Sequence, residues 1–130
     1  MKQKICDEIM KLYLYADMSK MIHYSTDTNH EHELCDEVRD GIVEFADTLA
    51  EQFFGTDGKP SFGDFSLKHE IRDAEHIGDL CEYVDDILTS LSNTFSNKNE
   101  YKGIISAIDD FKGDIAKYKF LATFNKLSKY

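Results

Sequence analysis

Proline and glycine are scarce in this sequence of 130 residues, which has one proline, seven glycines and no tryptophan. A fold built from many short strands needs frequent tight turns, and glycine and proline are the residues that most often form them. Their scarcity argues against a sheet-rich fold and favours a few long helices.

Basic residues are also few, with 15 lysines and arginines against 25 aspartates and glutamates and a formal net charge of −10. This charge disfavours nonspecific attraction to nucleic-acid phosphates or anionic membranes and favours metal cations or basic partners. Near the start of the chain there is no basic tail, only Lys2 and Lys4. A nucleic-acid patch close to the C-terminus is kept as a minor alternative, and its lysines are Lys117, Lys119, Lys126 and Lys129.

No apolar run is long enough to cross a bilayer, and residues 1–8 mix charged with apolar side chains instead of forming a secretory signal. The three cysteines, Cys6, Cys35 and Cys81, are widely separated and form no C-x-x-C pair. This pattern predicts reduced, mostly buried thiols and neither a disulfide framework nor a structural zinc site. We therefore expect a cytoplasmic protein that does not enter a membrane.

Four segments carry apolar residues at the spacing of an amphipathic helix, and loop-forming residues separate them at 25–29, 55–63 and 92–99. The chain length suits one domain, covering residues 1–130. Four helices bury one apolar stripe each most simply as a bundle, so we predict an all-α four-helix domain. The stripes are, in chain order, Ile5, Ile9, Leu12 and Ala16; Leu34, Val38, Ile42, Phe45, Leu49 and Phe53; Leu67, Ile71, Ala74, Cys81, Val84, Leu88 and Leu91; and Ile104, Ile108, Phe111, Ile115, Tyr118 and Ala122.

The helix boundaries are predicted from capping residues and loops. The first helix is expected to end near Tyr24, and the third to begin at Asp64 or Ser66, either of which can cap a helix N-terminus. The connection between the second and third helices, residues 55–65, is the longest of the predicted loops. It is the expected crossover of the bundle.

One stripe of the second helix combines a histidine with carboxylates. At about 100° per residue, His32, Asp36, Asp47 and Glu51 fall within a stripe about 100° wide that faces away from the apolar residues. A di-iron site inside a single bundle uses inward-pointing Glu-x-x-His triplets, and this sequence has none. A metal site on the stripe must therefore be completed from outside, most simply by the same stripe of a two-fold-related subunit.

Part of the sequence has the run His23-x8-His32-x3-Asp36-x10-Asp47-x3-Glu51, followed by Phe53, Phe54 and Gly55. This run resembles the ferroxidase signature of the Dps-like ferritins, which are the mini-ferritins of bacteria and of some phages. The resemblance is specific over residues 20–55. It implies a ferritin-like bundle in which His23, His32 and Asp36 of one subunit and Asp47 and Glu51 of its two-fold mate bind iron.

The resemblance also implies what the protein does and where. Dps-like ferritins oxidise Fe(II) with peroxide or oxygen at intersubunit sites, store the ferric mineral and assemble as homo-oligomers, which implies a closed cage here. Imidazole and carboxylate ligands accept zinc and manganese as well as iron. His23 is three residues closer to His32 than in the common bacterial members, and Tyr24 replaces the usual tryptophan; the shorter, phage-type relatives share both features. The expected setting is the cytoplasm of a bacterial or phage-infected cell.

A noncatalytic reading is kept beside the ferroxidase one. A charged stripe opposite an apolar stripe is typical of any solvated bundle helix, and a ferritin-like bundle can serve as an assembly or interaction module. His30, Glu31 and Glu33 are expected to be solvated loop residues. His69, Glu75 and His76 are expected on the third helix, with the two histidines as a surface pair and without a role.

Overall fold

Long amphipathic helices make up most of the chain in the structure, a computed structural model that describes residues 1–66, 68–96 and 98–124. No strand occurs in that part of the chain, and the prediction of an all-α, four-helix bundle is confirmed. The elements are α1 (Lys2–Ser25), α2 (Asn29–Asp57), the short 3-10 helix η1 (Phe62–Asp64), α3 (Ile77–Phe95), the 3-10 helix η2 (Asn99–Tyr101) and α4 (Lys102–Ala122).

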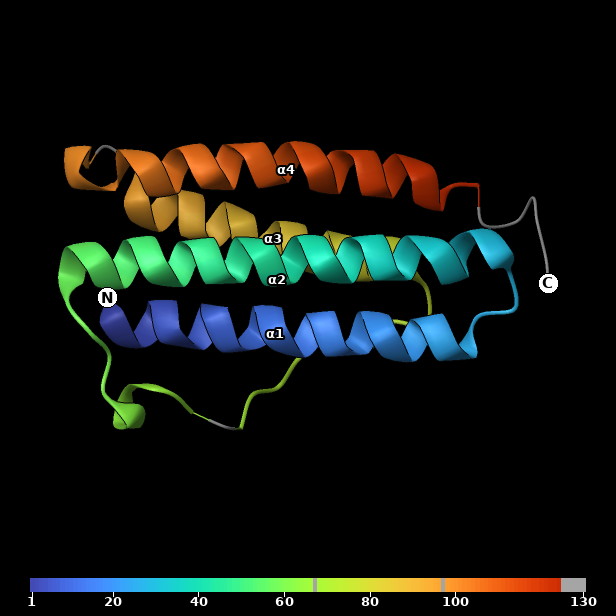
Figure 1. Ribbon diagram of the computed structural model, residues 1–130, viewed down its shortest axis with the longest axis horizontal. Coiled ribbons are helices and arrows are strands. Elements are labelled where there is room, and N and C mark those ends of the chain that lie inside the picture. The colour runs from blue at the N-terminus through green and yellow to red at the C-terminus, as the bar shows by residue number, and fades with distance from the viewer. Residues whose placement is uncertain (67, 97, 125–130) are drawn as a thin grey trace.

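The order of the helices around the bundle differs from their order in the chain. α1 packs on α2, α2 on α4, α4 on α3 and α3 on α1, and the two members of each of the pairs α1/α2 and α3/α4 run in opposite directions (Figure 1). The diagonal helices α2 and α3 run in the same direction. Both begin at one end of the bundle, where Glu31 of α2 accepts a hydrogen bond from the backbone N–H of Ile77 (2.9 Å). The connection between them must therefore return along the bundle.

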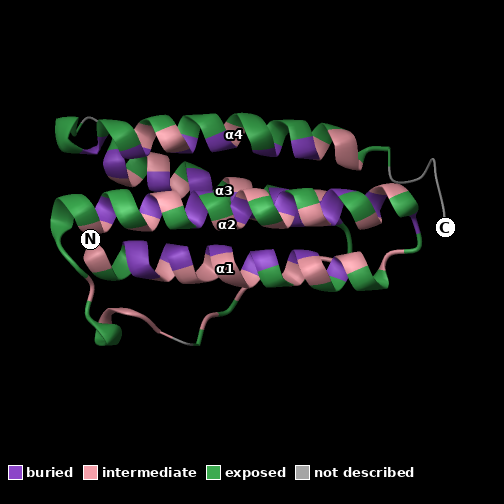
Figure 2. Ribbon diagram, in the orientation of Figure 1, coloured by how far each residue is buried: buried purple, intermediate pink, exposed green. Residues whose placement is uncertain are grey.

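The predicted apolar stripes of α1, α2 and α4 lie in the core, apart from Ala122, which is half-buried. Figure 2 shows this as purple segments on the inner sides of the helices. Burying such stripes removes apolar surface from water and is the main force that holds four amphipathic helices together. At one end of the bundle, the rings of Phe53, Phe95 and Tyr101 pack on one another, with centroids 4.8 to 6.4 Å apart.

The third helix begins at Ile77, so the prediction that it begins at Asp64 or Ser66 is wrong. Asp64 instead closes η1, where its carboxylate accepts hydrogen bonds from the backbone N–H and the hydroxyl of Ser61 (2.8 and 3.2 Å). The connection between α2 and α3 therefore covers residues 58–76, and the predicted loop 55–65 is too short.

The length that this connection must span explains the difference. α3 has 19 residues and is about 28 Å long. Residues 65–76 reach up to about 40 Å when extended but only about 18 Å as a helix, so only the extended form returns the chain to the start of α3. Ile71 and Ala74, predicted on the third helix, lie half-buried in this connection and pack against the core, and Leu67 lies outside the described residues.

All three cysteines are buried and free, as predicted. Burial raises the pKa of Cys35 and of Cys81 to about 12. Burial also raises the pKa of Cys6. None of the described helices is long and apolar enough to span a membrane.

Candidate metal centre

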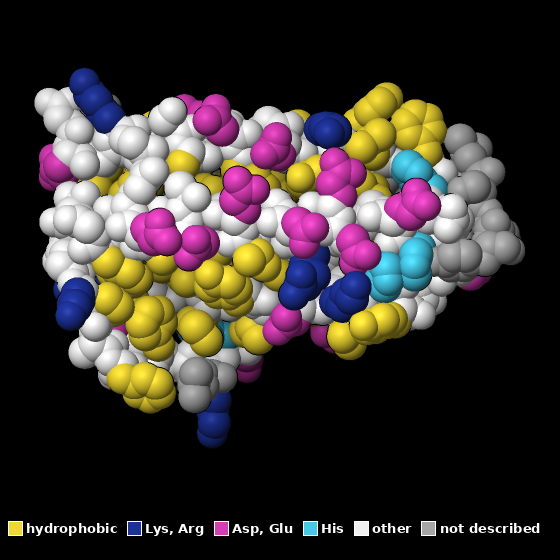
Figure 3. Space-filling model, viewed as in Figure 1, with side chains coloured by type: hydrophobic (Ala, Val, Ile, Leu, Met, Phe, Trp, Pro, Cys, Tyr) yellow, Lys and Arg dark blue, Asp and Glu magenta, His cyan; other side chains and the backbone are white. Residues whose placement is uncertain are grey.

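His23 and His32 stack on each other where α1 passes into α2. Their ring centroids are 3.6 Å apart and the angle between the rings is 27°. His23 Nδ1 lies 2.7 Å from the backbone oxygen of His32, and His32 Nδ1 lies 2.9 Å from the backbone oxygen of His23. Figure 3 shows histidine side chains at this end of the molecule. The two predicted histidine ligands are therefore neighbours in the fold.

These hydrogen bonds fix the protonation of both rings. A carbonyl oxygen only accepts, so each Nδ1 carries the proton and donates it. In a neutral imidazole the lone pair is then on Nε2. Metal-binding histidines usually hold their second ring nitrogen in this way, against a backbone carbonyl or a carboxylate. In both His23 and His32, Nε2 is thus the ring nitrogen that carries the lone pair for a metal.

Asp36 stands beside the histidine pair, one turn after His32 on α2. Its Oδ1 lies 3.5 Å from His23 Nδ1 and accepts a hydrogen bond from Lys20 Nζ at 2.9 Å. The hydrogen bond from Lys20 lowers the pKa of Asp36, so this side chain is ionised at neutral pH. In a single chain, Lys20 is the cation that neutralises it.

Asp47 and Glu51 are exposed and lie one turn apart in the second half of α2. Tyr13 of α1 lies near both carboxylates. Burial raises the pKa of Tyr13, and the negative charges of Asp47 and Glu51 raise it further. Asp47 is eleven residues after Asp36, which places the two about 16 Å apart along the helix. One chain therefore holds the five predicted ligands as two separate groups. Within the residues that the structure describes, no three His, Cys, Asp or Glu side chains are arranged to hold a metal ion.

Glu31 is buried, so the prediction that it is a solvated loop residue is wrong. Its side chain is 1% exposed. It accepts hydrogen bonds from the Thr26 hydroxyl (2.5 Å) and from the backbone N–H of Ile77 (2.9 Å), and His76 Nδ1 lies 3.2 Å away. Glu31 thus joins the start of α2 to the turn after α1 and to the first residue of α3. The spacing Thr28-x-x-Glu31, which is that of a capping box, was the signal in the sequence.

His69 and His30 also differ from the prediction of solvent-exposed groups, whereas His76 agrees with it. His69 lies in the connection before α3, its side chain is 8% exposed, and its Nε2 is 3.8 Å from Asp7 Oδ1 of α1. His76 is the N-cap residue of α3 and stays exposed. His30 Nε2 lies 2.7 Å from the backbone oxygen of Leu121 and so ties α2 to α4. Glu33 and Glu75 are exposed.

The lysines proposed as a nucleic-acid patch are paired with carboxylates where the structure describes them. Lys117 lies 3.4 Å from Glu37, and Lys119 lies 3.3 Å from Glu82 and 3.5 Å from Asp85. Lys126 and Lys129 lie outside the described residues. These ion pairs reduce the positive charge that this end of α4 offers to phosphate groups.

Comparisons of the chain with protein-family models, with curated proteins and with solved structures return no match.

Proposed function

We propose that this protein is a ferritin-like homo-oligomer of Dps type that binds Fe(II) at sites shared by two-fold-related subunits and oxidises it with peroxide or oxygen. The observation that carries the proposal is the stacked pair of His23 and His32, held in the ligand tautomer beside Asp36. Iron is the substrate of the reaction, and the ferric product is stored. Zinc or manganese would bind the same ligands.

The helix order supports the ferritin-like part of the proposal. Ferritin-like bundles differ from simple up-and-down bundles in having one long crossover. Here residues 58–76 return along the bundle so that α2 and α3 run in the same direction. The turn between α1 and α2 and the link between α3 and α4 join antiparallel neighbours, as in that topology.

The positions of the ligands along α2 have the symmetry that a two-fold site needs. The midpoint between His32 and Glu51 lies between residues 41 and 42, and so does the midpoint between Asp36 and Asp47. At about 100° per residue, the four side chains also fall within one stripe about 100° wide, so all of them face the same side of α2. A two-fold axis at that point places His32 opposite Glu51 of the partner and Asp36 opposite Asp47 of the partner. Two equal sites would form, each with ligands from both chains.

The face of the molecule around the second half-site is suited to contact between subunits. Tyr13, Val43, Ala50 and Phe54 are partly buried apolar residues on α1 and α2. In Figure 3, apolar side chains gather over this part of α1 and α2 and over the connection below it. Near the histidine pair, the large side chain of Tyr24 is 69% exposed. A second copy would cover such surface, which a monomer leaves in water.

The proposal is tested by calorimetric titration of the metal-free protein with Fe(II) without oxygen, followed by oxygen or peroxide while the ferric absorbance is recorded. We expect saturable binding and rapid oxidation, and Asp47→Asn should weaken binding about tenfold or more, because one carboxylate ligand is lost. Asp109→Asn, an exposed carboxylate on α4, is the control and should bind as the wild type does. Absence of saturable binding, or a protein that stays monomeric in light scattering, would contradict the proposal.

Lys20 should limit metal affinity, because its ammonium group occupies the carboxylate that the metal needs. We expect Lys20→Met to bind Fe(II) about tenfold more tightly, since the metal no longer has to displace a salt bridge. The control is Lys11→Met, because Lys11 lies on the same helix with similar side-chain exposure, 34% against 33%, and pairs with Glu8 instead. The measurement is the same titration, and weaker binding by Lys20→Met would contradict the expectation.

A second function is supported by the same histidine pair. Its reciprocal hydrogen bonds join the end of α1 to the start of α2, so both rings stabilise the turn without a metal. A noncatalytic assembly or interaction module would keep these contacts, and it would oligomerise without binding or oxidising Fe(II). The titration above separates the two functions.

A further inference from the structure

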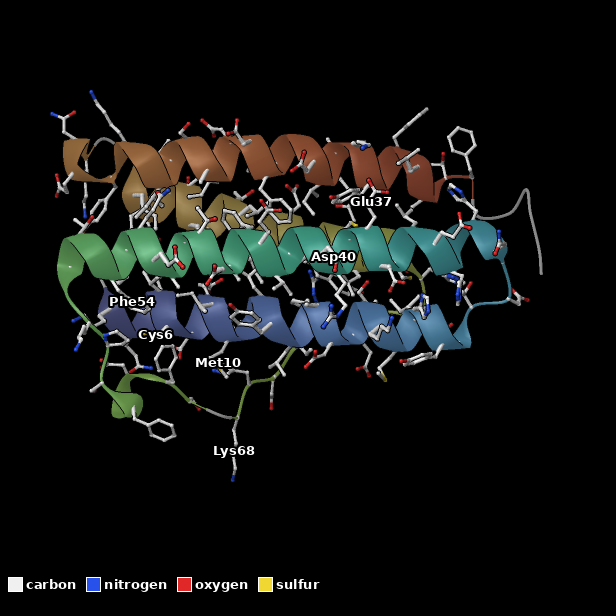
Figure 4. The ribbon with its side chains drawn as sticks, in the orientation of Figure 1. Cys6, Met10, Glu37, Asp40, Phe54 and Lys68 are labelled. Carbon is white, nitrogen blue, oxygen red and sulfur yellow. The ribbon has the colours of Figure 1, made fainter. Side chains whose placement is uncertain are left out.

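A groove with an acidic rim and an aromatic floor runs between α2 and α4. It encloses about 380 Å³, which is within the size range of small-molecule sites. The rings of Phe45 and Phe111 stack in it, with centroids 4.9 Å apart and an interplanar angle of 12°. The labelled Glu37 and Asp40 in Figure 4 stand on α2 along this groove. Its carboxylates are Glu37, Asp40, Glu44, Asp110 and Asp114.

Most of this negative charge has no cation to balance it. Glu37 pairs with Lys117 at 3.4 Å, and Asp40 lies 3.6 Å from Arg39. No ion pair neutralises the other three carboxylates, those of Glu44, Asp110 and Asp114, within the described part of the chain. The groove thus keeps an excess of negative charge next to apolar ring faces, an arrangement that attracts organic cations.

Tyr118 adds a buried polar group to the groove. The residue is 7% exposed, and its hydroxyl forms no hydrogen bond with any described residue. A Cβ atom placed on Gly41 would lie 2.8 Å from this hydroxyl and 3.3 Å from the Phe111 ring, so the groove depends on glycine here. Burial and then the charges of Asp114 and Glu37 raise the pKa of Tyr118 to about 12, so the hydroxyl keeps its proton at neutral pH. The hydroxyl lines the groove and is not among the fully buried atoms of the described residues, so it is open to a ligand that donates or accepts a hydrogen bond there.

We propose that the groove between α2 and α4 binds an aliphatic polyamine, with its ammonium groups on the carboxylates and the Tyr118 hydroxyl and its methylene groups on the aromatic floor.

The spread of the carboxylates favours a long polycation over a metal ion. A divalent metal needs several oxygens converging on one point at about 2.0 to 2.6 Å, and the described side chains include no such group of three or more. Glu37 and Glu44 are about 10 Å apart along α2, and Asp110 and Asp114 are about 6 Å apart along α4. A linear polyamine has charges at intervals separated by apolar carbons, which suits charges in rows above a floor of rings. The groove lies on the α4 side of α2 and does not depend on the iron chemistry proposed above.

The test is calorimetric titration of the metal-free protein with spermidine, at low salt and again at physiological ionic strength. We expect saturable binding that Asp114→Asn and Tyr118→Phe each weaken about tenfold, because each loses one hydrogen bond to an ammonium group. Asp109→Asn removes the same charge from the same helix outside the groove and should change affinity less than twofold. Circular dichroism melting of Tyr118→Phe, which removes one oxygen atom, checks that the fold is unchanged.

Two results would overturn the proposal. One is the absence of saturable spermidine binding at low salt. The other is equal weakening by Asp114→Asn and Asp109→Asn with no effect of Tyr118→Phe, which would mean that spermidine responds only to net charge. Mg²⁺ titrated in parallel should bind more weakly than spermidine, and Tyr118→Phe should leave the affinity for Mg²⁺ unchanged. Binding of Mg²⁺ as tight as that of spermidine would likewise overturn the polyamine assignment.

Discussion

Two inactive variants, mixed and allowed to exchange subunits, are expected to recover about a quarter of the wild-type rate of Fe(II) oxidation, because random pairing makes half of the dimers mixed and each mixed dimer has one intact site. One variant is His23→Asn with His32→Asn, and the other is Asp47→Asn with Glu51→Gln. In the mixed dimer, the histidines of the second variant meet the carboxylates of the first. The opposite site lacks both histidines and the carboxylates of Asp47 and Glu51, and keeps only Asp36.

The choice of asparagine keeps the fold while removing the ligand. The Asn amide nitrogen can take the place of Nδ1 and donate to the same backbone carbonyl, whereas the Nε2 lone pair is lost. Each variant alone is the control and should show no oxidation above buffer. Subunit exchange is verified by mass spectrometry with one isotope-labelled variant. Exchange without recovery, in a protein whose wild type oxidises Fe(II), would show that the site is not shared in the way the symmetry of α2 indicates.

Glu31→Ala is expected to lower the free energy of unfolding by about 3 kcal/mol, the largest stability effect we expect from a polar residue here. The substitution leaves the Ile77 N–H and the Thr26 hydroxyl without their carboxylate acceptor, and it leaves a cavity at the start of α3. For a chain of this length, the melting temperature should fall by about 10 °C. Urea unfolding followed by circular dichroism gives the free energy directly.

Glu33→Ala is the matched control for this prediction. Glu33 lies two residues after Glu31 on the same helix but is exposed, and its loss should change stability by no more than about 0.5 kcal/mol. Glu31→Gln keeps the shape of the side chain and one acceptor oxygen. Its free energy of unfolding should lie between those of Glu31→Ala and Glu33→Ala. If Glu31→Ala is as stable as Glu33→Ala, the contacts of Glu31 do not hold the start of α3.

The helices could be predicted where their periodicity was decisive. The apolar spacing of Leu34, Val38 and Ile42 continues to Phe53, over about five turns of α2, and those residues are buried as expected. Ile71 lies three residues before Ala74, and Ala74 lies seven residues before Cys81, which is the spacing of one helix face, but Ile71 and Ala74 belong to the crossover. Periodicity predicts which side chains are buried. It does not predict the distance that a connection between two parallel helices must span.

In the candidate site, too, some contacts could be predicted from the sequence and others could not. His23, His32 and Asp36 could be predicted as neighbours, because one turn joins α1 to α2 and the spacing of α2 is regular. The partners of Glu31 could not, because Ile77 is 46 residues away and reaches it only after the crossover. Lys20 was also missed as the partner of Asp36, since its position depends on how α1 and α2 pack.

The burial of the cysteines bears on how the protein would withstand the oxidant that we propose it uses. Peroxide attacks the thiolate form of cysteine, and a thiol with a pKa of about 12 has roughly one thiolate in 10⁵ at neutral pH. Cys35 is adjacent in sequence to Asp36, so one such sulfur lies next to the histidine pair yet points into the core, where it is 0% exposed. Sulfenic acid formation, and the crosslinking of subunits through disulfides that follows from it, is therefore disfavoured even beside the proposed site of oxidation.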